Sequence, residues 1–180
     1  WTTEEQNFAS TIVDFVTVAV ETQERKQLEQ QIQTAFERRG RQVQISTQVS
    51  QSIAAAASLE DLYQRVVIQV KEQFGYYHTQ ILRYDAAQEA IVLVTGYGET
   101  GAKMLAAGHR LPMGEGLIGT SATTGETVLR SALENDPDWH PNPLLPDTKG
   151  EIAVPIKLGD TILGVLDVQS NVTGALDADD

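Results

Sequence analysis

The chain has 180 residues, of which 41% are hydrophobic and 21% are charged, so it can form one domain with a full hydrophobic core plus a further segment. It contains 25 Asp and Glu against 13 Lys and Arg, and this net charge of −12 disfavours binding to nucleic acid. The lack of cysteine excludes disulfides, thiolate nucleophiles and Cys-ligated metals. Neither an apolar run of about 18 residues nor a secretory signal is present, so we predict no membrane insertion and a cytoplasmic location.

Glycine and proline divide the chain into two parts. Residues 1–74 contain one glycine, Gly40, and no proline, whereas residues 75–180 contain all the other glycines and all 6 prolines. Because these residue types interrupt regular structure, we expect a long helical segment followed by a turn-rich globular part. We place the two parts at residues 1–56 and 57–180.

Residues 3–56 predict one helix of roughly 50 residues, because Gln, Glu, Arg and Ala dominate the segment. A seven-residue register gives a seam in which about half of the positions are apolar, which favours a weak parallel two-stranded coiled coil. The alternative is an ordinary amphipathic helix that breaks, or folds back, at Gly40. The residues expected at the dimer interface are Phe8, Phe15, Ile32, Phe36, Val43 and Ile53.

The second part opens with the strongest local helix signal. Ser58-Leu-Glu-Asp61 is a capping box, in which the Ser hydroxyl accepts a backbone N–H and the Asp61 carboxylate lies near the positive helix end. Apolar residues then recur at spacings of three and four from Leu59 to Phe74, and Gly75 ends the helix.

After Gly75 the hydrophobic period falls to two, which is typical of strands. We expect two antiparallel hairpins, the second with a two-residue Gly159-Asp160 turn. Strands and short helices do not alternate regularly, so the pattern indicates an α+β fold with one antiparallel sheet. The expected strands cover residues 78–84, 90–95, 110–113, 127–130, 151–158 and 161–168, and the expected short helices cover residues 101–107 and 116–124.

The sequence gives little support for catalysis. Gly114-Glu-Gly-Leu-Ile-Gly119 matches the dinucleotide-binding pattern, but Pro112 interrupts the preceding strand and Gly125 ends the following helix too early. We therefore interpret these glycines as a sharp strand-to-helix turn. The three histidines lack metal-ligand spacing, and no nucleophile motif surrounds any serine. We predict that the chain is not an enzyme.

The loop from Asp136 to Pro146 is the segment that most favours ligand binding. Four prolines restrict it, and Trp139 with Leu144 and Leu145 gives it an apolar inner side. Asp136, Asp138 and His140 could share a cation, although such a run is more often a solvated turn. The alternative to a binding loop is one that only buries Trp139 over an end of the sheet.

Seven short motifs occur in a characteristic order between about Ser58 and Ala175. They are Leu59-Glu-Asp-Leu62, Phe74-Gly-Tyr-Tyr-His78, Leu111-Pro-Met-Gly-Glu-Gly-Leu-Ile-Gly119, Thr124-Gly-Glu126, Asn135-Asp-Pro137, Glu151-Ile-Ala-Val-Pro-Ile156 and Gly164-Val-Leu-Asp-Val-Gln-Ser170. In this order and spacing they resemble the GAF domain, the small-molecule sensor module of cyclic nucleotide phosphodiesterases, phytochromes and bacterial histidine kinases.

The resemblance implies a long N-terminal helix (a coiled-coil linker) followed by a GAF-like antiparallel β-sheet of five or six strands. It places helices on one face of the sheet and a ligand pocket on the other, roofed by the Trp139 loop. Family members that attach a bilin covalently, and the free methionine sulfoxide reductases of this fold, use cysteine, so we expect neither here, and the cofactor is unknown. By position, the candidate ligand-binding residues are Tyr97, Met113, Trp139, His140, Leu145, Glu151 and Val154.

The ends of the chain suggest a piece of a larger sensor. The N-terminal residues resemble the closing helix of a preceding module, and Ala175 to Asp180 resemble the start of the last GAF helix. We expect a sensory module that binds a small molecule and signals through a dimeric helix to an output domain such as a histidine kinase. The alternatives are a ligand-free GAF domain that serves dimerisation, and an unidentified enzyme activity.

Overall fold

A computed structural model describes residues 2, 20–34, 36–37, 39–40, 47, 51 and 55–177 of the chain. The chain divides into two compact units, residues 1–50 and 51–180. The domain boundary expected between residues 56 and 57 stays a prediction.

In the first unit, residues 20–34, 36–37 and 39–40 are helical. The single helix expected over residues 3–56 is not supported, because most of that segment lies outside the described residues. Two of the predicted interface residues are described: Ile32 is 51% exposed and Phe36 is 76% exposed in the single chain. Phe8, Phe15, Val43 and Ile53 lie outside the described residues, so the coiled coil stays a prediction.

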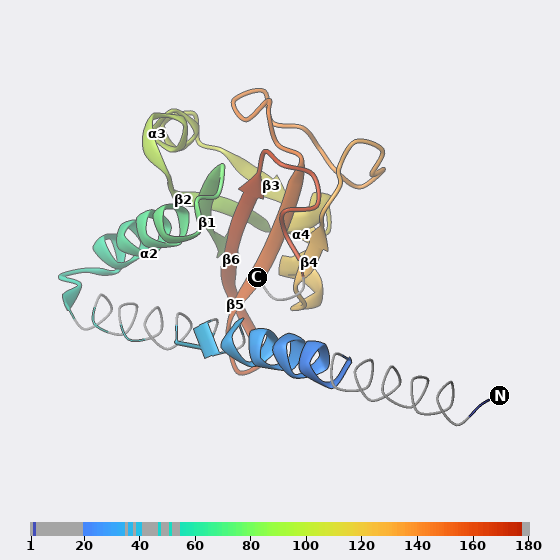
Figure 1. Ribbon diagram of the computed structural model, residues 1–180. Coiled ribbons are helices and arrows are strands. Elements are labelled where there is room, and N and C mark those ends of the chain that lie inside the picture. The colour runs from blue at the N-terminus through green and yellow to red at the C-terminus, as the bar shows by residue number, and fades with distance from the viewer. Residues whose placement is uncertain are drawn as a thin grey trace. The chain divides into compact units, whose positions relative to one another are not determined.

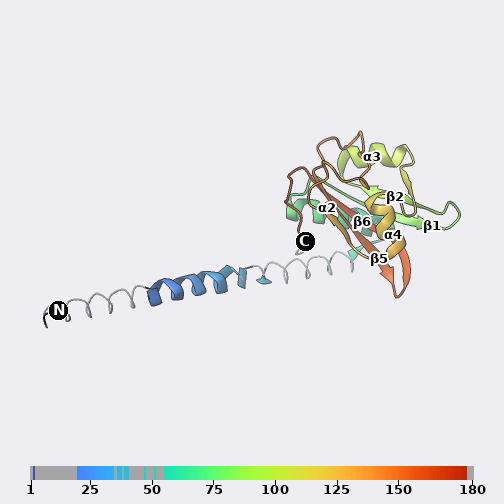
Figure 2. The same cartoon turned by 90° about the vertical axis from the view of Figure 1, so that its right-hand side faces the viewer.

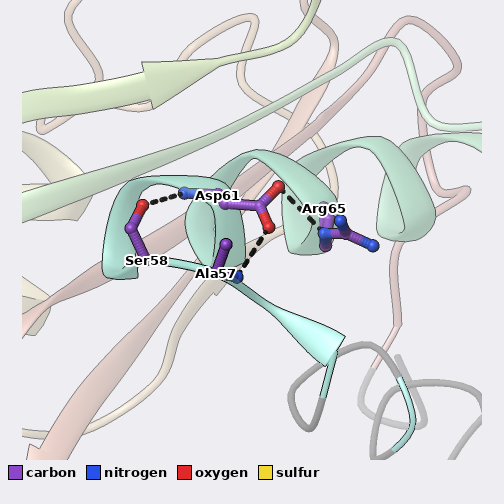
Figure 3. A network of polar contacts seen from close by, with 4 residues as sticks. All are labelled: Ala57, Ser58, Asp61 and Arg65. Atoms are coloured by element: carbon purple, nitrogen blue, oxygen red, sulfur yellow. Dashed lines mark hydrogen bonds and ion pairs between the residues drawn. The ribbon is translucent and has the colours of Figure 1, made fainter.

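The first helix of the second unit, α2 (Leu59–Phe74), has the caps that its sequence predicts. The Asp61 backbone N–H donates to Ser58 Oγ at 3.1 Å, and Asp61 Oδ2 accepts from the Ala57 backbone N–H at 3.0 Å (Figure 3). Arg65 Nε donates to Asp61 Oδ1 at 2.9 Å, one turn further on. Gly75 ends the helix in the left-handed region, with φ 70°. Local sequence therefore determines both ends of α2.

Six strands form one antiparallel sheet with the order β3-β2-β1-β6-β5-β4 (Figure 1). This confirms the expected α+β fold and both hairpins, with strand ends shifted by one or two residues. The strands are β1 (His78–Asp85), β2 (Ala90–Gly96), β3 (Arg110–Pro112), β4 (Val128–Arg130), β5 (Gly150–Leu158) and β6 (Thr161–Ser170).

The two short helices are α3 (Gly98–Ala106) and α4 (Gly116–Thr124). The predicted bounds of α4 are confirmed, whereas α3 begins three residues earlier than expected. Gly101 lies inside α3, where a Cβ would come within 2.1 Å of the Gly96 carbonyl carbon. This glycine allows the helix to touch strand β2, and does not mark a helix boundary.

The expectation that all helices lie on one face of the sheet is wrong. On one face, Val70 of α2 packs with Ile152, Val168 and the C-terminal Leu176. On the opposite face, which we call the inner face, Met104 of α3 and Leu117 of α4 join the main core cluster. Figure 2 shows α2 and α4 on opposite sides of the sheet. Helices cover both faces because the sheet carries an apolar cluster on each.

Among the described residues, no helix combines the length and apolar character needed to cross a membrane. The cytoplasmic location stays a prediction.

Candidate ligand-binding cavity

A cavity of about 190 Å³ lies on the inner face, between the sheet, the start of α4 and the loop that joins β4 to β5. Its polar residues come from three strands and from this loop, and its apolar residues come mainly from β3, α4 and Trp139. The lining residues are Gln80, His109, Leu111, Glu115, Gly116, Leu117, Ile118, Trp139, His140, Asn142, Glu151 and Gln169.

Two glycines shape the side of the cavity at the start of α4. Gly116 has φ 64°, and a Cβ there would lie 3.5 Å from His140 Nδ1. At Gly119 a Cβ would come within 2.5 Å of the Pro112 carbonyl oxygen. The Gly114 N–H also donates to the Gly119 carbonyl at 2.9 Å. The sharp strand-to-helix turn predicted from these glycines is therefore confirmed, and it brings α4 against the cavity.

The cavity floor is a row of buried polar side chains on three neighbouring strands, of which Gln80, Glu151 and Gln169 line the cavity, whereas Asp167 is fully buried within the row. The sheet register pairs Gln80 of β1 with Asp167 of β6, and Gln169 of β6 with Glu151 of β5. Because side chains alternate along a strand, all four point to the inner face. Each is at most 6% exposed. Such a row is unusual, since buried charged and amide groups need partners.

Asp167 is the centre of this row. Its Oδ2 accepts hydrogen bonds from Gln80 Nε2 and from Gln169 Nε2, both at 2.9 Å. Thr148 Oγ1 donates to Gln169 Oε1 at 2.7 Å. Gln80 Oε1 and Asp167 Oδ1 are buried and have no hydrogen-bond partner within the described part of the chain. Asp167 Oδ2 thus accepts an N–H from the side-chain amides of both Gln80 and Gln169. Two buried acceptor oxygens, Gln80 Oε1 and Asp167 Oδ1, have no donor among the described residues.

The two carboxyl groups of the floor affect each other. Burial, followed by the negative charge of Asp167, raises the pKa of Glu151 well above its usual range. Burial also raises the pKa of Asp167 to about 6, although the hydrogen bonds from Gln169 and Gln80 oppose this rise. The pair titrates as a unit, and Glu151 is the better proton carrier because Asp167 already accepts two N–H groups.

The β4–β5 loop is held over the cavity by polar contacts at two points. Arg130 Nε and Asp136 Oδ2 form an ion pair at 2.7 Å, and Asp136 Oδ1 accepts from the Asp138 N–H at 2.9 Å. Asn142 Nδ2 lies 3.6 Å from Met104 Sδ on α3. No cluster of three metal-ligating side chains exists in the part of the chain that the structure describes. The Asp136 carboxylate therefore stabilises the loop through Arg130 and the Asp138 N–H, and the hypothesis of a shared cation has no support.

The structure brings three of the seven predicted site residues to the cavity, namely Trp139, His140 and Glu151. Trp139 is half-buried and packs against the main core cluster. Leu145 is buried within that core, and Met113 packs against it. Tyr97 precedes α3, with Lys71 Nζ 4.7 Å from its ring centre. Val154 lies on the α2 face, so strand alternation points it away from the cavity.

The sequence analysis missed Gln80, Asp167 and Gln169. A signal was present in β6, because Asp167 and Gln169 occupy alternate positions in a strand that is otherwise mainly apolar. Their proximity, however, depends on the pairing of β1 with β6, and those strands are far apart in the sequence.

The family model for the GAF domain matches residues 56–180. The chain belongs to the GAF domain family. Domains of this family are in general regulatory or sensory ligand-binding modules. The resemblance inferred from the order of motifs is therefore confirmed, whereas the histidine-kinase context is not shown. A comparison with curated proteins gives no match.

Several solved structures share the fold. The GAF domain of a phosphoenolpyruvate-protein phosphotransferase from Coxiella burnetii is 26% identical, with a TM-score of 0.67 over 73% of this chain and 78% of that chain. The free methionine-R-sulfoxide reductase of Neisseria meningitidis, solved with its substrate, is 24% identical, with a TM-score of 0.64 over 73% and 74%. The type II free methionine-R-sulfoxide reductase of Thermoplasma acidophilum is 18% identical, with a TM-score of 0.56 over 68% and 84%.

The prediction that the chain is not an enzyme is wrong as an inference from the fold. Two of these similar structures are reductases, so this architecture supports catalysis as well as sensing. The absence of cysteine from this chain excludes cysteine chemistry alone, and a search for nucleophile motifs does not detect buried carboxyl groups such as Glu151 and Asp167.

Proposed function

We propose that this GAF domain is a sensory module that binds a small molecule carrying an ammonium or similar cationic donor group. The observation that carries this proposal is the cavity floor, where Gln80 and Glu151 line the cavity, Gln80 Oε1 has no donor among the described residues, and the fully buried Asp167 beside them has an Oδ1 without a donor. A ligand with several N–H donors would satisfy these oxygens, and a positive charge would balance the buried carboxylate.

The rest of the cavity supports the same ligand class. None of the described lining residues is Lys or Arg, so no side chain of the lining supplies a permanent positive charge. Leu111, Leu117 and Ile118 offer apolar surface to a short hydrocarbon group. A volume of about 190 Å³ corresponds to roughly six water molecules, at about 30 Å³ each, which limits the ligand to the size of a small amine.

A matched set of probes tests this proposal. We expect n-butylammonium to raise the melting temperature in a saturable way, because a ligand that binds only the folded state stabilises it. n-Butanol has the same butyl chain without a charge, and pentanoate has the same butyl chain with a negative charge, so neither should give a saturable shift. Differential scanning fluorimetry of the full chain measures all three.

The variant Asp167→Asn is the matched control for the amine probe. It keeps the shape of the side chain but removes the buried charge, so the shift by n-butylammonium should fall at least tenfold in apparent affinity, about 1.4 kcal/mol. Equal shifts for the ammonium and the carboxylate would contradict the assignment of the ligand class.

We also propose that ligand binding is transmitted through a dimeric N-terminal helix to an output domain, such as a histidine kinase. The apolar Ile32 and Phe36 support this, because both are exposed in a described helical segment and occupy successive seam positions of the seven-residue register. The alternative is a GAF domain that serves dimerisation without a ligand, and it would dimerise equally but respond to none of the probes.

Replacing Ile32 and Phe36 together by aspartate should convert the dimer to monomers. The double change places four negative charges in a two-stranded seam, where they are desolvated and repel one another. Analytical ultracentrifugation gives the mass. Changing the exposed Glu24 and Gln31 to aspartate is the control, since neither lies at a seam position, and a dimer that survives the seam substitutions would disprove the coiled coil.

A further inference from the structure

Glu151 lacks a counter-ion although a cation lies directly opposite it in the sheet. The β4–β5 register pairs Arg130 with Glu151. The Arg130 guanidinium instead bonds to Asp136 Oδ2 at 2.7 Å and to the Leu129 carbonyl oxygen at 2.9 Å. Glu151 is 6% exposed and lies one diagonal step from Asp167, which is fully buried. Two buried carboxylates so placed cannot both be ionised at low cost.

The hydrogen bonds identify which group carries the proton. Asp167 Oδ2 accepts two amide N–H groups, an arrangement that suits an ionised carboxylate. Its second oxygen, Oδ1, is buried and accepts no hydrogen bond from any described donor. A proton on Glu151 would give Oδ1 a donor. The apo cavity floor then has a net charge of −1.

We propose that Glu151 and Asp167 together hold one exchangeable proton and that the ammonium group of the ligand replaces it. The inference rests on the proposed function, because it needs a cationic ligand. In the exchange the Glu151 O–H bond breaks, the proton leaves to the solvent, and the ammonium donates to the ionised Glu151, which lines the cavity beside the buried Asp167. The net charge of the floor remains −1, since one positive charge enters as one leaves, and no other covalent bond changes. Ligand binding is thereby linked to pH.

Other titratable groups surround the floor, and none explains the exchange. His78 of β1 lies beside Gln80, and burial lowers its pKa to about 4, so it is neutral at pH 6 to 7. Burial also lowers the pKa of His109, which precedes β3. His140 and Asp136 on the loop and Glu115 before α4 complete the set. Of these, Glu115 and His140 line the cavity from exposed positions.

Calorimetric titration with n-butylammonium, in buffers of different ionisation enthalpy at the same pH, measures the number of protons released. We expect about one proton per bound ligand near pH 7, above the pKa of Asp167, and an affinity that rises about tenfold per pH unit while Glu151 holds its proton. The variant Glu151→Gln should bind with no proton release and no pH dependence, because its amide N–H replaces the carboxyl proton permanently. Glu134→Gln, at an exposed position outside the cavity lining, should release the proton as the parent does.

Infrared spectroscopy provides a readout without ligand. The carbonyl stretch of a protonated carboxylic acid should be present in the apo protein near neutral pH and absent from Glu151→Gln, with Asp167→Asn as a second variant if the first does not fold. Saturable amine binding without proton release, or an apo protein without the protonated carbonyl band, would overturn the inference and leave the proposed function standing. No saturable binding of n-butylammonium would overturn both.

Discussion

Replacing Glu151 by glutamine is expected to raise the melting temperature above neutral pH and to change it little at pH 4. The pKa of Glu151 is raised in the folded protein, so the folded state binds this proton more tightly than the unfolded state does. Below the pKa that Glu151 has in the unfolded chain, its carboxyl group is protonated in both states, and the free energy of unfolding is not reduced. As the pH rises through the folded pKa, stability falls, and Gln, which cannot ionise, avoids this loss.

The size of the effect follows from the raised pKa of Glu151, whose largest cause is burial. Each unit of pKa difference between the folded and the unfolded state corresponds to about 1.4 kcal/mol, and relief of a loss of this size shifts the melting temperature by several degrees. Thermal unfolding of parent and variant from pH 4 to pH 8 measures the difference. Glu115→Gln, at an exposed position, should follow the parent. If the melting temperatures of the parent and of Glu151→Gln change with pH in the same way, ionisation of Glu151 does not destabilise the folded protein.

Replacing Gly119 by alanine should destabilise the protein by about 2–3 kcal/mol, although the same change in an ordinary helix stabilises it by about 1 kcal/mol. The added Cβ would come within 2.5 Å of the Pro112 carbonyl oxygen and 3.1 Å of the Gly114 nitrogen. Both atoms belong to the backbone, so α4 has to move away from β3. Because Gly116 and Leu117 line the cavity, amine binding should weaken as well.

Gly40 provides the opposite case for this comparison. It is helical, and a Cβ there would meet nothing within 4 Å. Gly40→Ala should therefore increase helix content in circular dichroism and leave the melting of the GAF domain unchanged.

If the Gly119→Ala protein were as stable as the parent, α4 and β3 would not be in contact through Gly119.

The experiments above separate two properties of the same residue row. Asp167 orients the side-chain amides of Gln80 and Gln169, which is a structural role. In our proposal it also shares one proton with Glu151, which is a role in binding. Asp167→Asn affects both properties, whereas Glu151→Gln affects charge alone. Comparing the two variants in stability and in amine binding therefore assigns each property to its side chain.

Local sequence patterns were sufficient to predict most of the secondary structure and the family. Ser58, Asp61 and Gly75 fix the ends of α2 through contacts within a few residues, so local chemistry was sufficient. The same holds for the Gly159-Asp160 hairpin and for the turn into α4. The order of short motifs was sufficient to recognise the GAF family and to place Trp139, His140 and Glu151 at the cavity.

The combination of polar residues in the site depends on long-range strand pairing, which no local pattern predicts. Asp167 and Gln80 are 87 residues apart, and they meet because β6 inserts between β1 and β5 in the sheet. Strand alternation, once the register is known, turns Glu151 toward the cavity and Val154 away from it. Burial then shifts the pKa values of Glu151 and Asp167, and burial is a property of the packed core that no local sequence pattern contains.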